Sequence, residues 1–95
     1  MPAYLIVDLT VTDPAGFEEY RRQVSATLEQ YGGRYLVRGG AHERLEGDWQ
    51  PGRVVVIEFA TREAARRWYD SDEYRGPKAV RLRTARTNLL LVDGI

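Results

Sequence analysis

Cysteine is missing from this sequence altogether, and histidine occurs only once, at His42. Without thiols the protein has no disulfide framework and no thiolate to act as nucleophile or metal ligand. His42 stands beside Glu43, but adjacent residues of an extended segment point to opposite sides, so these side chains do not converge on one ion. We therefore expect no metal site and no histidine-centred catalytic site.

An excess of charge of either sign is also missing, because 14 basic and 14 acidic side chains leave a formal net charge of zero. The arginines are interleaved with acids instead of forming one block, so we expect no nucleic-acid partner. No apolar run approaches membrane-spanning length, and the first residues lack a charged segment followed by a long apolar core. The prediction is a cytoplasmic protein with no membrane partner.

Phosphate-binding loops are absent as well. The two glycine pairs, Gly32-Gly33 and Gly39-Gly40, lack the lysine and spacing of a P-loop and the three glycines of a dinucleotide fingerprint. We expect no cofactor and interpret these glycines as structural. The first pair can end a helix with a positive φ, and the second permits a bulge or kink.

What is present is a clear alternation of strand and helix patterns within one domain over residues 1–95. Asp13 is a natural N-cap with Pro14 at the first helical position, and apolar residues follow at helical spacing as far as Tyr31. The run RVVVIEFA is rich in β-branched residues, which favours a central strand covered on both faces. Strands are predicted at residues 3–11, 35–37, 53–60 and 86–93.

The connections between these elements carry turn and cap signals. Residues 41–46 can resume an extended course, and residues 47–52, which include Trp49, are dense in turn formers, so we predict a hairpin. Trp49 would then cover a partner subunit or the mouth of a pocket. A second helix starts after Thr61, Ser71 caps a further turn, and Gly76-Pro77 are expected to restart a short helix.

The predicted order is that of the ferredoxin-like βαββαβ fold, an α+β architecture with a four-stranded antiparallel sheet and its helices on one face. Right-handed crossovers are expected to make the first and third strands parallel neighbours in the middle of the sheet. The other sheet face has nothing in this chain to cover it, although apolar residues occur at both parities of three strands. We therefore expect a homodimer that packs through its sheet faces.

Several spaced motifs resemble the DUF1330 family. They are YGGRYLVRGG, LEGDW, RVVVIEF, AARRWYDSDEY, Arg81 and the terminal Val92-Asp93-Gly94. The resemblance implies the dimeric α/β-barrel superfamily, in which two ferredoxin-like subunits pack sheet against sheet. Relatives at that level include cofactor-free monooxygenases of aromatic compounds, muconolactone isomerase, EthD-like proteins and ligand-sensing domains. The family itself has no established activity, so the resemblance implies a fold and leaves the function open.

One candidate site consists of polar residues that interrupt the apolar strands, namely Asp8, Arg38, Glu58 and Asn88. With the strand directions expected above, they converge at one rim of the sheet. Asp8 or Glu58 would be a catalytic base and Arg38 would bind the substrate anion. The alternative is a structural network of ion pairs.

A second candidate group lies in and after the second helix, and it resembles the family's W-Y-x-S-x-x-Y segment with a downstream arginine. Arg81 would hold a carboxylate or enolate, while hydroxyls and aromatic faces orient a planar ligand. The predicted binding residues of this group are Tyr69, Ser71, Tyr74 and Arg81, and Tyr20 on the first helix could reach the same cavity. The alternative is that the aromatic residues are core, Ser71 is only a cap and Arg81 pairs with Asp72.

Two functions stay open at this point. The first is a cofactor-free enzyme, of isomerase or monooxygenase type, that acts on a small aromatic or carbonyl acid. The second is a non-catalytic ligand-binding or assembly module.

Overall fold

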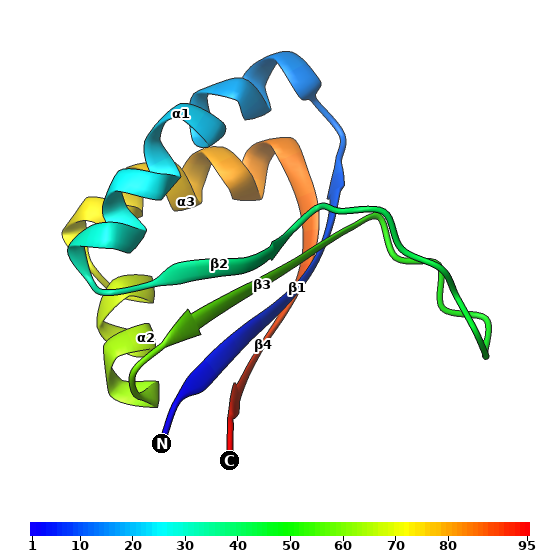
Figure 1. The fold of residues 1–95 in the computed structure, drawn as a ribbon. Coiled ribbons are helices and arrows are strands. Elements are labelled where there is room, and N and C mark those ends of the chain that lie inside the picture. The colour runs from blue at the N-terminus through cyan, green and yellow to red at the C-terminus, as the bar shows by residue number, and fades with distance from the viewer.

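A computed structural model describes all residues from 1 to 95 and shows a four-stranded sheet with three helices on one of its faces (Figure 1). The elements are β1 (Ala3–Val11), α1 (Pro14–Gln30), β2 (Arg34–Arg38), β3 (Arg53–Phe59), α2 (Arg62–Tyr69), α3 (Asp72–Thr84) and β4 (Ala85–Asp93). None of the helices is long and apolar enough to cross a membrane.

The strand order is β2-β3-β1-β4, and every neighbouring pair is antiparallel. The predicted ferredoxin-like fold class is confirmed. The expectation that the first and third strands run parallel is wrong, because Tyr4 of β1 lies opposite Glu58 and Asp8 lies opposite Val54. The crossover through α1 joins β1 to β2, which run in the same direction, and β3 returns between them from the β2–β3 connection.

The core lies between the sheet and the helices. Leu5, Val7 and Leu9 alternate along β1 toward the helices and are buried, as the strand pattern predicted. Trp68 of α2 is 1% exposed, stacks on Tyr74 with ring centroids 4.0 Å apart, and donates its indole N–H to Thr27 Oγ1 at 3.0 Å. The buried indole therefore has its hydrogen-bond partner, which buried polar groups require.

The helix starts follow the predicted caps. Asp13 accepts a hydrogen bond from the Gly16 N–H at 3.2 Å, and Thr61 accepts one from the Ala64 N–H at 3.0 Å. The prediction of a short helix restarting at Gly76-Pro77 is wrong, since α3 begins after its cap Ser71 and runs unbroken through Pro77. Proline removes one intrahelical hydrogen bond, and the helix continues because its buried face packs against α1.

The two glycine pairs end the elements that precede them. Gly32 has φ of +79° directly after α1, as predicted for a helix stop. The bulge predicted at Gly39-Gly40 lies instead inside β2, between Tyr35 and Val37. Gly39 follows the strand with φ of +70°. The segment after it, residues 39–52, forms no ladder and extends as an arm away from the sheet (Figure 1), so the extended course predicted for residues 41–46 is not a strand.

Candidate functional site: an arginine-lined cavity

A cavity of about 70 Å³ lies on the helix-covered face of the sheet. It has sixteen lining residues, of which twelve are hydrophobic or aromatic and the other four are arginines. The arginines are Arg21, Arg38, Arg53 and Arg81. No aspartate or glutamate lines this cavity. Since it is several times larger than the space one water needs and smaller than sites for drug-sized molecules, it suits a small ligand.

The most buried part of the cavity, which we call its inner end, contains three polar side chains linked by hydrogen bonds. The Arg81 Nε–H donates to the Tyr74 hydroxyl oxygen at 3.2 Å, and the Tyr74 and Tyr20 hydroxyls are 2.9 Å apart. Tyr74 is 1% exposed and Arg81 4% exposed. Tyr74 and Arg81 are seven residues apart on α3, which is two helical turns, and Tyr20 reaches them from α1.

Arg81 has no carboxylate partner. Asp72, the partner considered for it from the sequence, instead forms an ion pair with Arg75 at 2.6 Å. A guanidinium has five donors, and Tyr74 occupies one of them. The Arg81 side chain is therefore buried, and none of its donors contacts a carboxylate of this chain.

The Tyr20 hydroxyl at the inner end is a neutral hydrogen-bonding group. Burial, and then the neighbouring Tyr74, raise the pKa of Tyr20 well above its ordinary value, so its hydroxyl stays protonated. For Arg81, burial alone acts to lower the pKa, but the adjacent oxygens of Tyr74 and Tyr20 outweigh it and the net direction is upward. The inner end thus presents one cation and two hydroxyls to an incoming ligand.

The outer end of the cavity carries the other three arginines. Arg38 lies over the Tyr35 ring at 4.3 Å and donates to Ser25 Oγ at 3.2 Å. All three line the same cavity, and Arg53 Nη2 lies 3.5 Å from the Arg38 carbonyl oxygen. Burial, and then the charges of Arg21 and Arg38, lower the pKa of Arg53. An acid is near only one of them, with Arg21 Nε 3.7 Å from the Glu18 carboxylate at an exposed position.

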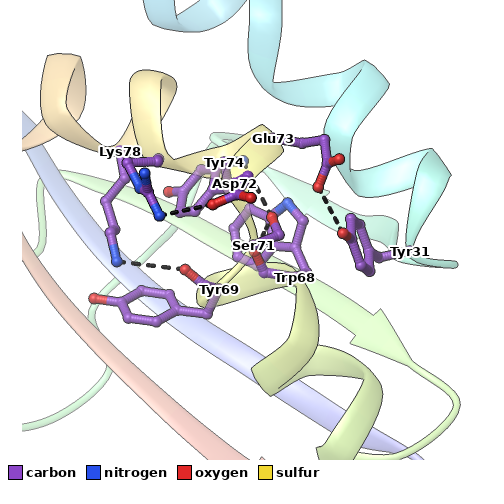
Figure 2. Close-up of polar contacts among 9 residues, drawn as sticks. Tyr31, Trp68, Tyr69, Ser71, Asp72, Glu73, Tyr74 and Lys78 are labelled. Atoms are coloured by element: carbon purple, nitrogen blue, oxygen red, sulfur yellow. Dashed lines mark hydrogen bonds and ion pairs between the residues drawn. The ribbon is translucent and has the colours of Figure 1, made fainter.

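Four of the six predicted binding residues line this cavity, namely Tyr20, Arg38, Tyr74 and Arg81. The other two lie beside it. Ser71 accepts the Tyr74 N–H at 3.1 Å and donates to the Trp68 carbonyl at 2.7 Å, which is the capping role considered as the alternative. Figure 2 shows this cap and, next to it, Tyr69 with Lys78, whose Nζ lies 4.2 Å from the Tyr69 ring centroid.

The two predicted bases do not line the cavity. Asp8 and Glu58 lie on the other sheet face and, because β1 and β3 are antiparallel, near opposite ends of it. Asp8 accepts from Trp49 Nε1 at 3.0 Å and from the Gly52 N–H at 2.9 Å, and Asn88 lies opposite it on β4. The expected convergence at one rim is therefore wrong for Glu58.

Glu58 instead forms an ion pair with Arg34 of β2 at 2.7 Å. An ion pair of this kind was the structural alternative to a catalytic role for the polar residues of the strands. His42 and Glu43 lie on the exposed arm and line no cavity described here.

Sequence reasoning missed Arg21, Tyr35 and Arg53 as lining residues. A signal existed for Arg21, because it stands four residues after Phe17 and three before Val24, both on the buried face of α1. Arg53 opens the most apolar strand of the chain, and only the pairing of β3 with β2 places it near Arg38.

The family model described as a domain of unknown function (DUF1330) matches residues 2–95. The chain belongs to the DUF1330 family. Among curated proteins, no sequence relative of this DUF1330 domain matches significantly.

Several solved structures share its fold. The RPA0582 protein of unknown function from Rhodopseudomonas palustris has a TM-score of 0.80 and 17% identity, over 99% of this chain and 82% of that one. SnoaB, a cofactor-independent oxygenase from Streptomyces nogalater, has a TM-score of 0.69 and 17% identity, over 99% and 93%. A dimeric ferredoxin-like protein of unknown function from Jannaschia has a TM-score of 0.69 and 8% identity, over 99% and 100%. At these identities the similarity establishes the fold of the DUF1330 domain and not its activity.

Proposed function

We propose that this DUF1330 domain binds the anion of a small aromatic or carbonyl acid in the arginine-lined cavity. The observation that carries the proposal is the burial of Arg81 without a carboxylate partner. An unpaired buried charge is costly, and it persists in proteins where a ligand or a function requires it. A carboxylate or enolate oxygen placed beside Arg81 would complete its hydrogen bonds.

The remaining lining residues suit the body of such an acid. Phe17, Trp68 and Tyr74 contribute aromatic surface, and aliphatic side chains of β1 and β3 form the floor. Apolar walls with a few convergent polar groups are the usual composition of small-molecule sites. The Tyr20 hydroxyl, which stays protonated, would serve as a hydrogen-bond donor to the ligand oxygen.

Turnover without a cofactor, as an isomerase or oxygenase, is the second candidate. It is favoured by the same inner end, because a cation and two hydroxyls stabilise a developing oxyanion. The cavity lining contains no carboxylate and no histidine to remove a proton. Binding of an anion that is already formed is therefore the function that the geometry supports best.

The test is a thermal-shift screen against small aromatic acids, keto acids and phenols. A ligand at 100 times its Kd should add about 2.7 kcal/mol to the free energy of unfolding. The stabilisation should vanish in Arg81→Gln and persist in Arg67→Gln, a matched control at an exposed position of α2. Stabilisation that persists in Arg81→Gln would overturn the site, as would the failure of every acid to stabilise the folded protein. Product analysis with each ligand that binds then separates turnover from binding.

We further propose that two copies pack through the open sheet faces. Ile6 lies between its cross-strand neighbours Val56 and Leu90 on this face, and Leu90 is 63% exposed. Trp49, held against Asp8 of the same face, extends the apolar surface onto the arm. A contiguous apolar face of this kind marks an interaction surface, and a self-complementary one suits a two-fold dimer.

A further inference from the structure

The cavity carries positive charge at two separate places. Arg81 lies at the inner end, on α3, and is 4% exposed. Arg21, Arg38 and Arg53 come from α1, β2 and β3, and the first two are exposed to solvent. Apolar side chains such as Val7, Val24 and Val55 line the same cavity.

A single anionic group cannot satisfy both ends of such a cavity. A carboxylate held by Arg81 and the tyrosine hydroxyls would leave the outer arginines without an acid, apart from the 3.7 Å contact between Arg21 and Glu18. Like charges that line one cavity repel one another, and a second anionic group among them would relieve the repulsion.

The existing contacts of the outer arginines leave donors free for that group. Arg38 is positioned by the Tyr35 ring and by Ser25, and Arg53 reaches only the Arg38 carbonyl, at 3.5 Å. Guanidinium groups held in this way bind carboxylates through paired hydrogen bonds. The outer end therefore has free donors suited to a second anionic group on the same ligand.

We propose that the ligand is a small dianion: a short dicarboxylic acid, or a one-ring aromatic acid with a second acidic group on the far side of the ring. This inference rests on the proposed function, since it assumes that the first anionic group binds at Arg81. It adds that Arg21, Arg38 and Arg53 select for the second group. The cavity volume of about 70 Å³ limits the enclosed apolar part between the two groups to a few carbons, so a one-ring acid would also extend toward the exposed Arg21 and Arg38.

The experiment compares acids that differ only in the second carboxylate, butyrate with succinate and benzoate with terephthalate, by isothermal titration calorimetry at low salt. We expect the diacid of at least one pair to bind about tenfold tighter than its monoacid, with a steeper loss of affinity as salt rises. Arg21→Gln and Arg38→Gln should each reduce that preference several-fold, because each weakens the diacid more than its monoacid. Arg22→Gln, at an exposed position of α1, is the matched control and should change neither. Arg81→Gln should weaken both acids.

The outcomes separate this inference from the proposed function. Monoacid binding that depends on Arg81, without any gain from a second carboxylate in either pair, would overturn the dianion inference and leave the proposed function standing. If none of the four acids binds to the folded protein, the dianion inference is overturned, and so is the proposal that the ligand is a small organic acid. A diacid preference that survives both Arg21→Gln and Arg38→Gln would contradict the assignment of the outer site.

Discussion

Arg81 is expensive to bury at its position on α3. Its side chain lies in the core with Trp68 and Tyr74 as neighbours along the cavity, and the only protein group that it contacts in a hydrogen bond is the Tyr74 hydroxyl. Taking a cation out of water costs several kcal/mol unless a partner compensates it. We therefore expect Arg81 to add little to the stability of the ligand-free protein, while it supplies the charge that binds an anion.

Replacing this cation with an apolar side chain of similar length should stabilise the protein. We expect Arg81→Met to raise the free energy of unfolding by about 1 kcal/mol while acid binding is lost. Urea unfolding monitored by tryptophan fluorescence measures the first effect. Arg67→Met, at an exposed position, is the control and should change stability by less than about 0.5 kcal/mol. A clear loss of stability in Arg81→Met would show that Arg81 is a structural residue of the core.

At the scale of elements, α3 is the element that assembles the inner end of the cavity. Its N-terminus is set by Ser71, which caps the helix and also holds the end of α2 through the Trp68 carbonyl (Figure 2). Tyr74 and Arg81 then project from one face toward Tyr20 of α1. The cap acts on the site through the helix and has no contact with the cavity.

Removing this cap should affect stability and not recognition. Ser71→Ala should lower the free energy of unfolding by about 1 kcal/mol, because the Tyr74 N–H loses its acceptor. Ligand affinity in the folded protein should stay within about twofold of the wild type. Differential scanning calorimetry through the unfolding transition measures the stability, and isothermal titration calorimetry below that range measures the affinity. A tenfold loss of affinity with unchanged stability would restore Ser71 as a binding residue.

The N-terminus of α2 is held to the end of β4 by an ion pair that should depend on pH. Arg62 Nε donates to Asp93 Oδ1 at 3.1 Å, and the hydrogen bond from Arg62 lowers the pKa of the Asp93 carboxyl. A carboxyl whose pKa is lowered in the folded protein stabilises the fold at pH values above its ordinary pKa of about 4. This stabilisation is lost as the pH falls through the lower pKa of the folded state.

Wild type should therefore have a higher Tm than Asp93→Asn near neutral pH, by a small margin because the pair is exposed. The two Tm values should converge as pH falls below about 4. Thermal unfolding followed by circular dichroism over a pH series tests this, with Asp48→Asn on the exposed arm as control. A Tm difference that persists unchanged at low pH would contradict the ionic origin.

On the scale of the whole molecule, the sheet has one face buried by helices and one left open. The open face carries Ile6, Val56 and Leu90 in register across three strands. A stable interface covers about 800 Å² on each partner, so the open sheet face and Trp49 would together have to supply an area of about this size.

The proposed dimer is tested with two leucines of nearly equal exposure. Leu90 on the open face is 63% exposed and Leu82 on α3 is 65% exposed. Leu90→Lys should shift the protein from dimer to monomer in sedimentation equilibrium at micromolar concentration, and Leu82→Lys should leave the mass unchanged, because only Leu90 lies on the open face. A wild-type monomer at these concentrations would overturn the sheet-packed dimer.

Local signals in the sequence were sufficient to determine the elements and their order. Asp13, Thr61 and Ser71 cap helices at the predicted positions, and Gly32 ends α1 with the positive φ expected of it. These features depend on neighbours within a few residues, so they can be derived without knowledge of the tertiary fold. Tyr74 and Arg81 share one face only because α3 runs unbroken through Pro77, where the sequence had predicted a new helix.

The tertiary structure alone decided which charged residues meet. The antiparallel pairing of β1 with β3 separates Asp8 from Glu58 and directs both away from the cavity. The same pairing, continued to β2, brings Arg53 beside Arg38. A one-residue change in register or a reversal of strand direction moves a side chain to another face or another end of the sheet, and no local pattern encodes that choice. The sequence therefore determined the fold class and four of the residues that line the cavity, and the long-range strand pairing determined the rest.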